Sequence, residues 1–222
     1  MPHRRRQRGE INREIVVSAA LALADRDGLS GVTVRALATF LEAPPMTLYS
    51  AFSSKSELLN LMYFEVAGRM FAGVDGQGWV EGLRLVGGTI RTMLSEHPNW
   101  APLLSRAAPP LTSEPREQLL AQMRDGGLSP EQAFSALSSV ILGSLGLMLV
   151  EFALREGSGE SGYSDRLQAL KASVDDEDDD QSVVTRQALK RLDRYQLGEI
   201  HQQSLEALLV GIQAWIGTAG GP

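Results

Sequence analysis

The chain has 222 residues, with 21 Lys and Arg against 27 Asp and Glu, which gives a net charge of −6. This length can bury a substantial core, and a content of 43% hydrophobic and 22% charged residues excludes a disordered or fibrous protein. The lack of cysteine excludes a disulfide scaffold, a thiolate metal site and a cysteine nucleophile. The histidines, His3, His97 and His201, are too scattered to predict a metal centre, so no cofactor is expected.

The charge is unevenly distributed along the chain. Residues 1–70 contain nine Lys and Arg against seven Asp and Glu, whereas residues 71–222 contain twelve against twenty. The first 13 residues carry five arginines and a single acid, Glu10. A basic N-terminal part is compatible with a polyanionic partner, because the charge of the contacting region decides the attraction. The net charge of the whole chain also includes the acidic remainder, which need not contact the partner.

No targeting or membrane-spanning segment is predicted. The N-terminal arginines are not followed by the apolar run of a signal peptide. The most apolar stretch, Val140–Leu154, is shorter than a bilayer requires and contains Glu151, which favours a buried helix. We therefore expect a cytoplasmic protein that does not contact a membrane.

Local signals predict a series of helices in the N-terminal part. Gly28 is expected to end the first helix, because glycine adopts the left-handed conformation of a helix end without strain. Thr33 and Ser54 are residue types that cap helix N-termini, and Pro45 is tolerated in a first turn. These signals predict helices over 10–27, 33–41, 45–51 and from 55 onward.

The rest of the chain is also predicted to be helical. Ser129, Pro130 and Gln132 form a strong start signal for a helix that is apolar nearly all round, which we expect to be buried on several sides. The acidic run Asp175–Asp180 is interpreted as a solvated linker rather than a cation site, because spaced ligands are missing. The predicted elements are helices over 79–96, 116–124 and 129–155, a flexible linker over 156–181 and a terminal helix from 183 or 196 to 216. The apolar stripe of the terminal helix is formed by His201, Leu205, Leu208, Ile212 and Trp215.

Two short helices joined by a tight turn, over 33–41 and 45–51, indicate a helix-turn-helix. In such a motif the first helix meets the DNA backbone and the second enters the major groove. A helix N-terminus with a hydroxyl side chain suits a phosphate, and a basic arm can follow the backbone or a minor groove. The candidate DNA-binding residues are Thr33, Arg35, Pro45, Met46, Thr47, Tyr49, Ser50 and Lys55, with Arg4, Arg5 and Arg6 in the arm.

The order and spacing of these residues resemble the DNA-binding domain of the TetR family. The matching residues are Thr33, Arg35, Leu37, Ala38, Leu48, Tyr49, Phe52, Lys55 and Leu58. The remaining chain resembles, more weakly, the C-terminal domain of the subfamily that contains the tetracycline repressor. The resemblance implies an all-α protein with a three-helix helix-turn-helix domain over 1–57 and a ligand-binding and dimerisation domain over 58–222. It implies a transcriptional regulator rather than an enzyme: a homodimer that binds a double-stranded DNA operator and a small-molecule effector, most often as a repressor.

The sequence departs from the family pattern at a few positions. Glu42 stands where the family usually has glycine in the turn, Ala51 replaces a common histidine, and Pro44 replaces the usual capping residue. A non-glycine residue in a left-handed turn costs about 1 kcal/mol unless the turn differs. Two alternatives therefore stay open: a helical small-molecule-binding protein that has lost specific DNA binding, and an activator instead of a repressor.

The resemblance also implies an effector pocket in the C-terminal domain. The histidine and magnesium contacts of the tetracycline repressor correspond approximately to Phe71, Val86, Ile90 and Leu103–Leu104, which are apolar and cannot bind metal. We therefore expect a mainly apolar or aromatic effector rather than a magnesium-bound tetracycline. The candidate ligand-binding residues are Phe71, Val86, Ile90, Met93, Trp100, Leu104, Met148 and, as a polar anchor, Glu151.

Overall fold

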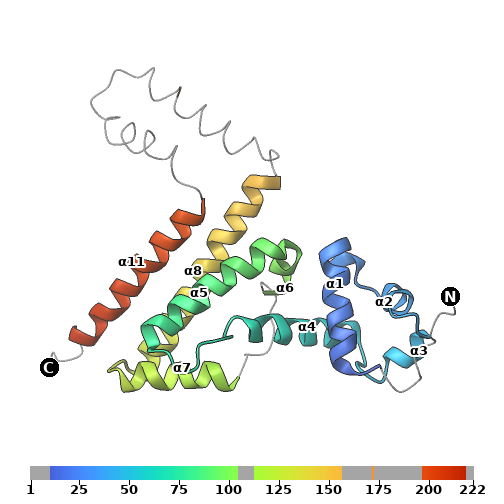
Figure 1. Cartoon of the computed structure of the whole chain (residues 1–222), viewed down its shortest axis with the longest axis horizontal. Coiled ribbons are helices and arrows are strands. Elements are labelled where there is room, and N and C mark those ends of the chain that lie inside the picture. Colours follow the sequence, from blue (N-terminus) through green and yellow to red (C-terminus); the bar gives the residue numbers. More distant parts are fainter. Residues whose placement is uncertain (1–10, 105–112, 157–171, 173–196, 219–222) are drawn as a thin grey trace. The chain divides into compact units, whose positions relative to one another are not determined.

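The computed structural model describes residues 11–104, 113–156, 172 and 197–218 (Figure 1). Every regular element in these residues is a helix, which confirms the all-α prediction. The chain divides into two compact units, one formed by residues 1–77 and 92–119 and the other by residues 78–91 and 120–222. The functional boundary expected between residues 57 and 58 stays a prediction.

The first unit begins with the predicted helix-turn-helix. Helix α1 (Arg13–Gly31) packs against α2 (Val34–Phe40) and α4 (Lys55–Arg69), and α2 packs against α3 (Pro45–Leu48). Each element contributes fully buried side chains to a common core, because apolar residues recur at helical spacing on its inner face. These core residues include Leu23, Leu37, Leu48, Phe52 and Leu58.

Side-chain caps fix where these helices begin. The hydroxyl of Thr33 accepts a hydrogen bond from the backbone N–H of Ala36 at 3.1 Å, and the hydroxyl of Ser54 accepts one from the N–H of Glu57 at 3.1 Å. Each bond satisfies one of the backbone donors that a helix N-terminus leaves without a partner. Both predicted caps are confirmed, and each fixes the position of a functional candidate that follows it.

Two helix ends differ in detail from the prediction. Gly28 adopts a φ of 69° as expected, but helical geometry resumes after it and α1 continues to Gly31. Helix α3 ends at Leu48 rather than Ala51. The backbone N–H of Ala51 bonds the carbonyl of Leu48, three residues back, so the chain continues as tight turns instead of an α-helix.

The first unit also contains a second group of elements. The end of α5 (Trp79–Glu96) is followed by the short helix η1 (Pro98–Trp100), α6 (Ala101–Leu104) and the start of α7 (Glu114–Asp125). Helix η1 packs against α1, and α6 packs against α4. The helix-turn-helix is thereby in direct contact with the segment that follows α5.

The second unit contains the start of α5, the end of α7, α8 (Pro130–Glu156) and α11 (Leu197–Thr218). Helices α8 and α11 lie side by side (Figure 1). The predicted start of α8 is confirmed, since Ser129 and Gln132 cap each other's backbone N–H at 3.2 and 2.8 Å. A Cβ on Gly87 would lie 2.8 Å from a methyl group of Leu205, so glycine permits the close approach of α5 to α11.

The prediction that α8 is buried on several sides is wrong for the single chain. Leu142, Leu149 and Val150 are exposed, because α5 and α11 leave one face of the helix uncovered. On α11 the buried stripe runs through Leu209 rather than Leu208, which is half-buried.

Helix α8 also bears on the question of membrane contact. Within the described residues, Pro130–Phe152 is long and apolar enough to cross a bilayer by length and composition, so the helix is longer than the apolar run suggested. The same two properties are common in packed helices of globular proteins. Ser144 and Glu151 are buried within this stretch against protein, which favours a packed helix.

Candidate nucleic-acid interface

The turn between α2 and α3 is left-handed and contains Glu42. Glu42 has a φ of 50°, and no other non-glycine residue of the described ranges has a positive φ. The N–H of Ala43 bonds the carbonyl of Ala38 at 2.9 Å, and the N–H of Glu42 bonds the carbonyl of Thr39 at 3.2 Å. These two bonds define a helix ending that strongly favours glycine at the position of Glu42. The strain expected from the sequence is therefore present.

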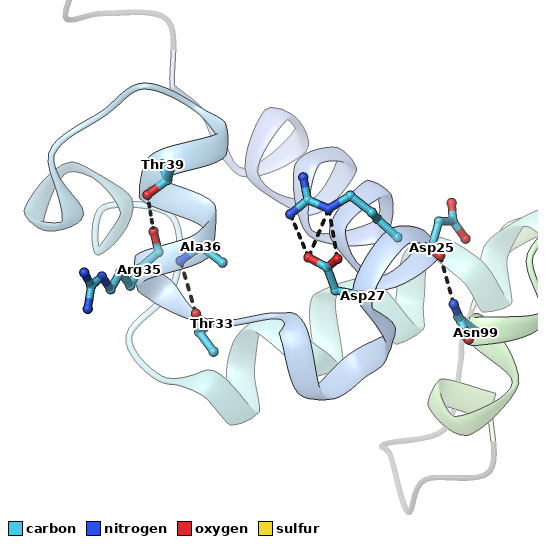
Figure 2. Close-up of polar contacts among 8 residues, drawn as sticks. Asp25, Asp27, Thr33, Arg35, Ala36, Thr39 and Asn99 are labelled. Carbon is cyan, nitrogen blue, oxygen red and sulfur yellow. Dashed lines mark hydrogen bonds and ion pairs between the residues drawn. The ribbon is translucent and has the colours of Figure 1, made fainter.

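The start of α2 presents polar groups at the surface. Thr33 and Arg35 are both exposed, and the cap hydrogen bond of Thr33 to Ala36 fixes the first turn. Figure 2 shows the guanidinium of Arg35 extending away from the helices. A helix N-terminus beside an extended cation is an arrangement that can bind a phosphate.

The following helix, α3, offers few hydrogen-bonding groups. Pro45 and Met46 are exposed and Thr47 is half-buried. The hydroxyl of Ser50 donates to the carbonyl of Thr47 at 2.8 Å. Tyr49 is 47% exposed and its ring lies 6.0 Å from that of buried Phe52, which leaves its face partly open.

Ion pairing separates two cations of this unit from the others. Arg13, Arg26 and Arg69 each have a carboxylate partner within 4 Å. Among the described residues no such partner exists for Arg35 or Lys55. An unpaired cation attracts a phosphate more strongly than one whose charge is already neutralised. Arg35 and Lys55, the two cations without a carboxylate partner among the described residues, are also the two cations of these helices that the sequence predicts to bind DNA.

Lys55 is the first residue of α4, and hydrogen bonds around the N-terminus of this helix fix its position. The Glu57 carboxylate accepts hydrogen bonds from the Ser53 hydroxyl at 2.5 Å and from the Ser53 backbone N–H at 2.7 Å. These bonds, with a smaller contribution from Arg13, lower the pKa of the Glu57 carboxyl below its ordinary value. The start of α4 is therefore fixed while Lys55 itself stays exposed.

The structure thus places the predicted DNA-binding residues of α2, α3 and α4 in one helix-turn-helix unit. Those it describes are Thr33, Arg35, Pro45, Met46, Thr47, Tyr49, Ser50 and Lys55. Arg4, Arg5 and Arg6 lie outside the described residues. A shallow surface cavity of about 340 Å³ is lined by the predicted residues Thr33 and Arg35 and by four residues that sequence reasoning missed, Arg26, Ala36, Thr39 and Phe40. None of these four residues occupies a helix-cap position or belongs to the motif that the sequence matched.

The predicted ligand-binding residues are distributed over both units. In the first unit Phe71, Met93 and Trp100 are buried and Leu104 is half-buried. In the second unit Val86, Ile90, Met148 and Glu151 are buried. A surface cavity of about 580 Å³ lies between α1 and α4, and none of these eight residues lines it. Their role in binding a ligand stays a prediction.

A polar cluster of the first unit joins α1 to the segment after α5. His97 Nδ1 lies 3.0 Å from Asp25 Oδ2, and the His97 ring stacks on Trp100 at 3.8 Å between centroids. The Trp100 Nε1–H donates to the carbonyl of Leu21 at 3.4 Å, and the guanidinium of Arg69 lies 5.1 Å from the indole centroid. Asn99 adds a bond to the carbonyl of Asp25 at 2.8 Å (Figure 2). Sequence reasoning missed this cluster because the contacts of His97, Asn99 and Trp100 with α1 join residues more than 70 positions apart.

A second cluster, in the second unit, joins Glu151 and His201, which were predicted separately from the sequence, to Arg91, which was not. Glu151 and His201 are both almost fully buried, and Arg91 Nη1 lies 3.8 Å from Glu151 Oε2. Burial, and then the charge of Arg91, lower the pKa of His201 below 6.5, while Glu151 acts in the opposite sense. His201 is therefore favoured in its neutral form.

Comparisons with known proteins agree with this architecture. Residues 16–62 match the family model of bacterial regulatory proteins of the tetR family, and residues 72–214 match the tetracycline-repressor-like C-terminal domain. The tetracycline repressor protein class E of Escherichia coli is 32% identical over 147 residues, which cover 64% of this chain and 69% of that protein.

Solved structures show the same fold. SCO7222, a TetR transcriptional regulator from Streptomyces coelicolor, superimposes with a TM-score of 0.73 at 25% identity, over 92% of this chain and 98% of that one. ActR from Streptomyces coelicolor, solved in complex with actinorhodin, has a TM-score of 0.72 at 20% identity, over 94% of this chain and all of that one. The match extends through both units of the chain.

Proposed function

Because the chain belongs to the TetR family of DNA-binding transcriptional regulators, we propose that it represses transcription from a palindromic operator and is released by a mainly apolar small molecule. The observation that carries the proposal is the pair of unpaired cations, Arg35 in the capped first turn of α2 and Lys55 at the start of α4. These groups bind phosphates on either side of α3, which then lies in the major groove. A protein that acts on DNA in this way works in the cytoplasm of a bacterium.

The proposed functional form is a homodimer joined through α8 and α11, in keeping with a family whose members bind operators as dimers. The exposed side chains of Leu142 on α8 and Val210 on α11 support this assignment, since solvent covers them in the single chain. Gly143 and Gly146 leave open space beside α8 where a partner helix can approach closely. Two recognition helices held about one DNA turn apart then read the two halves of the operator.

The proposed effector is an apolar or aromatic molecule. ActR has the same fold and was solved with actinorhodin, which supports a ligand-responsive regulator here. Val86, Ile90 and Met148 are buried carbon side chains of the second unit that can bind a ligand by contact but cannot ligate a metal. Glu151 is the proposed polar anchor. No step of the mechanism therefore passes through a magnesium ion.

Release is proposed to occur by a shift between two conformations. Trp100 links α1, through the carbonyl of Leu21, to Arg69 on α4. A ligand that favours a displaced position of η1 and α6 therefore also favours a displaced α4, which changes the separation of the recognition helices. An activator would use the same coupling with the opposite effect on transcription.

The proposal is tested by selecting genomic fragments with the purified full chain and measuring affinity against salt concentration. Arg35→Ala and Lys55→Ala are each expected to reduce the slope of log affinity against log salt by about one per protomer, because each removes a phosphate contact. Arg124→Ala is the matched control, since Arg124 belongs to the second unit and is already paired with Asp125 at 3.2 Å.

Tyr49→Ala combined with Lys55→Ala is expected to abolish DNA binding and to leave the dimer intact. Failure to retain any fragment would favour the alternative of a helical binding protein without specific DNA binding. An unchanged salt slope in both single variants would contradict the assigned interface.

A further inference from the structure

The exposed large apolar side chains of the first unit are concentrated in one short segment. Among its described residues they are Phe40 at the end of α2, Met46 on α3 and Tyr49 directly after α3, which fall within ten positions. Met46 is 77% exposed, more than any other large apolar side chain described in the chain. Single exposed apolar residues are ordinary, but a group of them on a binding element indicates a contact surface.

The same segment lacks the side chains that read bases by paired hydrogen bonds. Residues 43–54 contain no Arg, Lys, Asn or Gln, which are the residue types that recognise guanine and adenine in this way. Leu48 is fully buried, and the hydroxyl of Ser50 already donates to the carbonyl of Thr47. Beside the half-buried Thr47, the surface of α3 therefore offers mainly the carbon atoms of exposed Pro45 and Met46.

Among the base edges of the major groove, the apolar group is the 5-methyl of thymine. Resting on the proposed DNA-binding function, we propose that α3 reads its operator through thymine 5-methyl groups, with Met46 as the residue that determines specificity and Pro45 beside it. The unpaired cations Arg35 and Lys55 supply the charge complementarity that holds this apolar surface against a polyanion.

This mode of reading has a defined consequence for base preference. A methyl contact distinguishes thymine from cytosine and uracil, and it does not distinguish thymine from 5-methylcytosine at the same position. Because the methionine side chain is flexible and unbranched, it can contact methyl groups of neighbouring base pairs. The operator half-site therefore contains thymine at the base pair that faces Met46.

The test uses the full chain and the tightest genomic fragment from the selection described above. Each thymine of that fragment is replaced in turn by deoxyuridine, which keeps base pairing and removes only the methyl group. We expect one thymine in each half-site at which the replacement weakens binding about fourfold, the factor for one buried methyl-sized group. Replacing that thymine pair by cytosine and guanine weakens binding further, and 5-methylcytosine restores part of the loss.

Variants of Met46 assign the effect to this side chain. In Met46→Ala the deoxyuridine replacement is expected to change affinity less than twofold, whereas Met46→Leu, the matched control, keeps the sensitivity. Equal sensitivity in the wild type and Met46→Ala, or no sensitive thymine, overturns the inference while leaving the proposed function intact. A change of oligomeric state in Met46→Ala with unchanged sensitivity to deoxyuridine also overturns it, in favour of a protein-docking face. Failure of every genomic fragment to bind overturns the inference together with the proposed function.

Discussion

Within the part of the chain that the structure describes, two surfaces expose large apolar side chains, and their surroundings differ. At the end of α2, Phe40 lines the same surface cavity as Thr33, Thr39 and the unpaired cation Arg35, and exposed Met46 follows on α3. On α8 and α11, Leu142 and Val210 are 67% and 66% exposed, and residues 132–150 of α8 carry no charge. This second surface also contains small residues, for example Gly143 next to Leu142.

The difference between these surfaces shows that exposed apolar side chains do not by themselves identify the binding partner of a surface. Cations beside exposed carbon suit a groove that has phosphates at its rim and methyl groups at its base. Small residues beside exposed carbon suit another helix, because they let two backbones approach closely. The chemistry of the neighbours is therefore the basis on which DNA is proposed as the partner of α2 and α3, and a second protomer as the partner of α8 and α11.

Leu142→Glu should have the largest effect and would break this comparison at the second surface. A carboxylate buried in a helix–helix interface costs several kcal/mol in each protomer, so dimer affinity should fall on the order of a thousandfold. Sedimentation at several protein concentrations measures the change. Gln77→Glu, which adds the same charge at an exposed loop position, is the control. A Leu142→Glu protein that stays dimeric would show that α8 does not form the interface.

Glu42→Gly should have an intermediate effect and would sharpen the assignment of the first surface. Glycine removes the strain of a φ of 50°, so thermal unfolding should indicate about 1 kcal/mol of added stability. Glu42→Ala keeps a Cβ in the left-handed region and should not be stabilised in this way. Both variants remove a carboxylate near the DNA surface, so both should bind DNA more tightly. Equal stability of the two variants would contradict the strain argument.

His201→Gln should have the smallest effect and concerns the core beneath the second surface. The pKa of His201 is lowered in the folded chain, so its contribution to stability is fully present above pH 6.5 and is lost as the pH falls through the folded-state pKa. The groups that face it are Arg91 and Glu151. The fall in unfolding temperature from pH 7.5 to 5.5, at fixed protomer concentration, should be smaller in His201→Gln than in the wild type. An identical fall of the unfolding temperature in both proteins would show that His201 does not contribute to the pH dependence of stability.

Local features of the fold could be predicted from the sequence. The caps at Thr33, Ser54 and Ser129 depend on residues three positions apart, and each was predicted and is confirmed. The left-handed turn at Glu42 could be anticipated because the TetR resemblance marks that position as glycine. Arg35 and Lys55 were candidates because they match the TetR pattern, although their lack of carboxylate partners is visible only in the folded chain.

Features that depend on distant residues could not be predicted. The contact of His97 with Asp25 and the ion pair of Arg91 with Glu151 each join residues 60 or more positions apart. No periodic pattern or cap marks such pairs. The shift of the buried stripe from Leu208 to Leu209 has the same origin, since the packing of α11 against its neighbours decides which of two adjacent leucines is covered.

The stacked indole of Trp100 gives the molecule an optical property. It is the single tryptophan of the first unit, because Trp79 and Trp215 belong to the second. Indole emission is sensitive to ring stacking and to the hydrogen bond of the ring N–H, and Trp100 makes both contacts with residues of the first unit. A chain with phenylalanine at positions 79 and 215 would therefore carry an intrinsic fluorophore at the junction of α1, α4 and η1, where light emission could follow ligand binding without an attached dye.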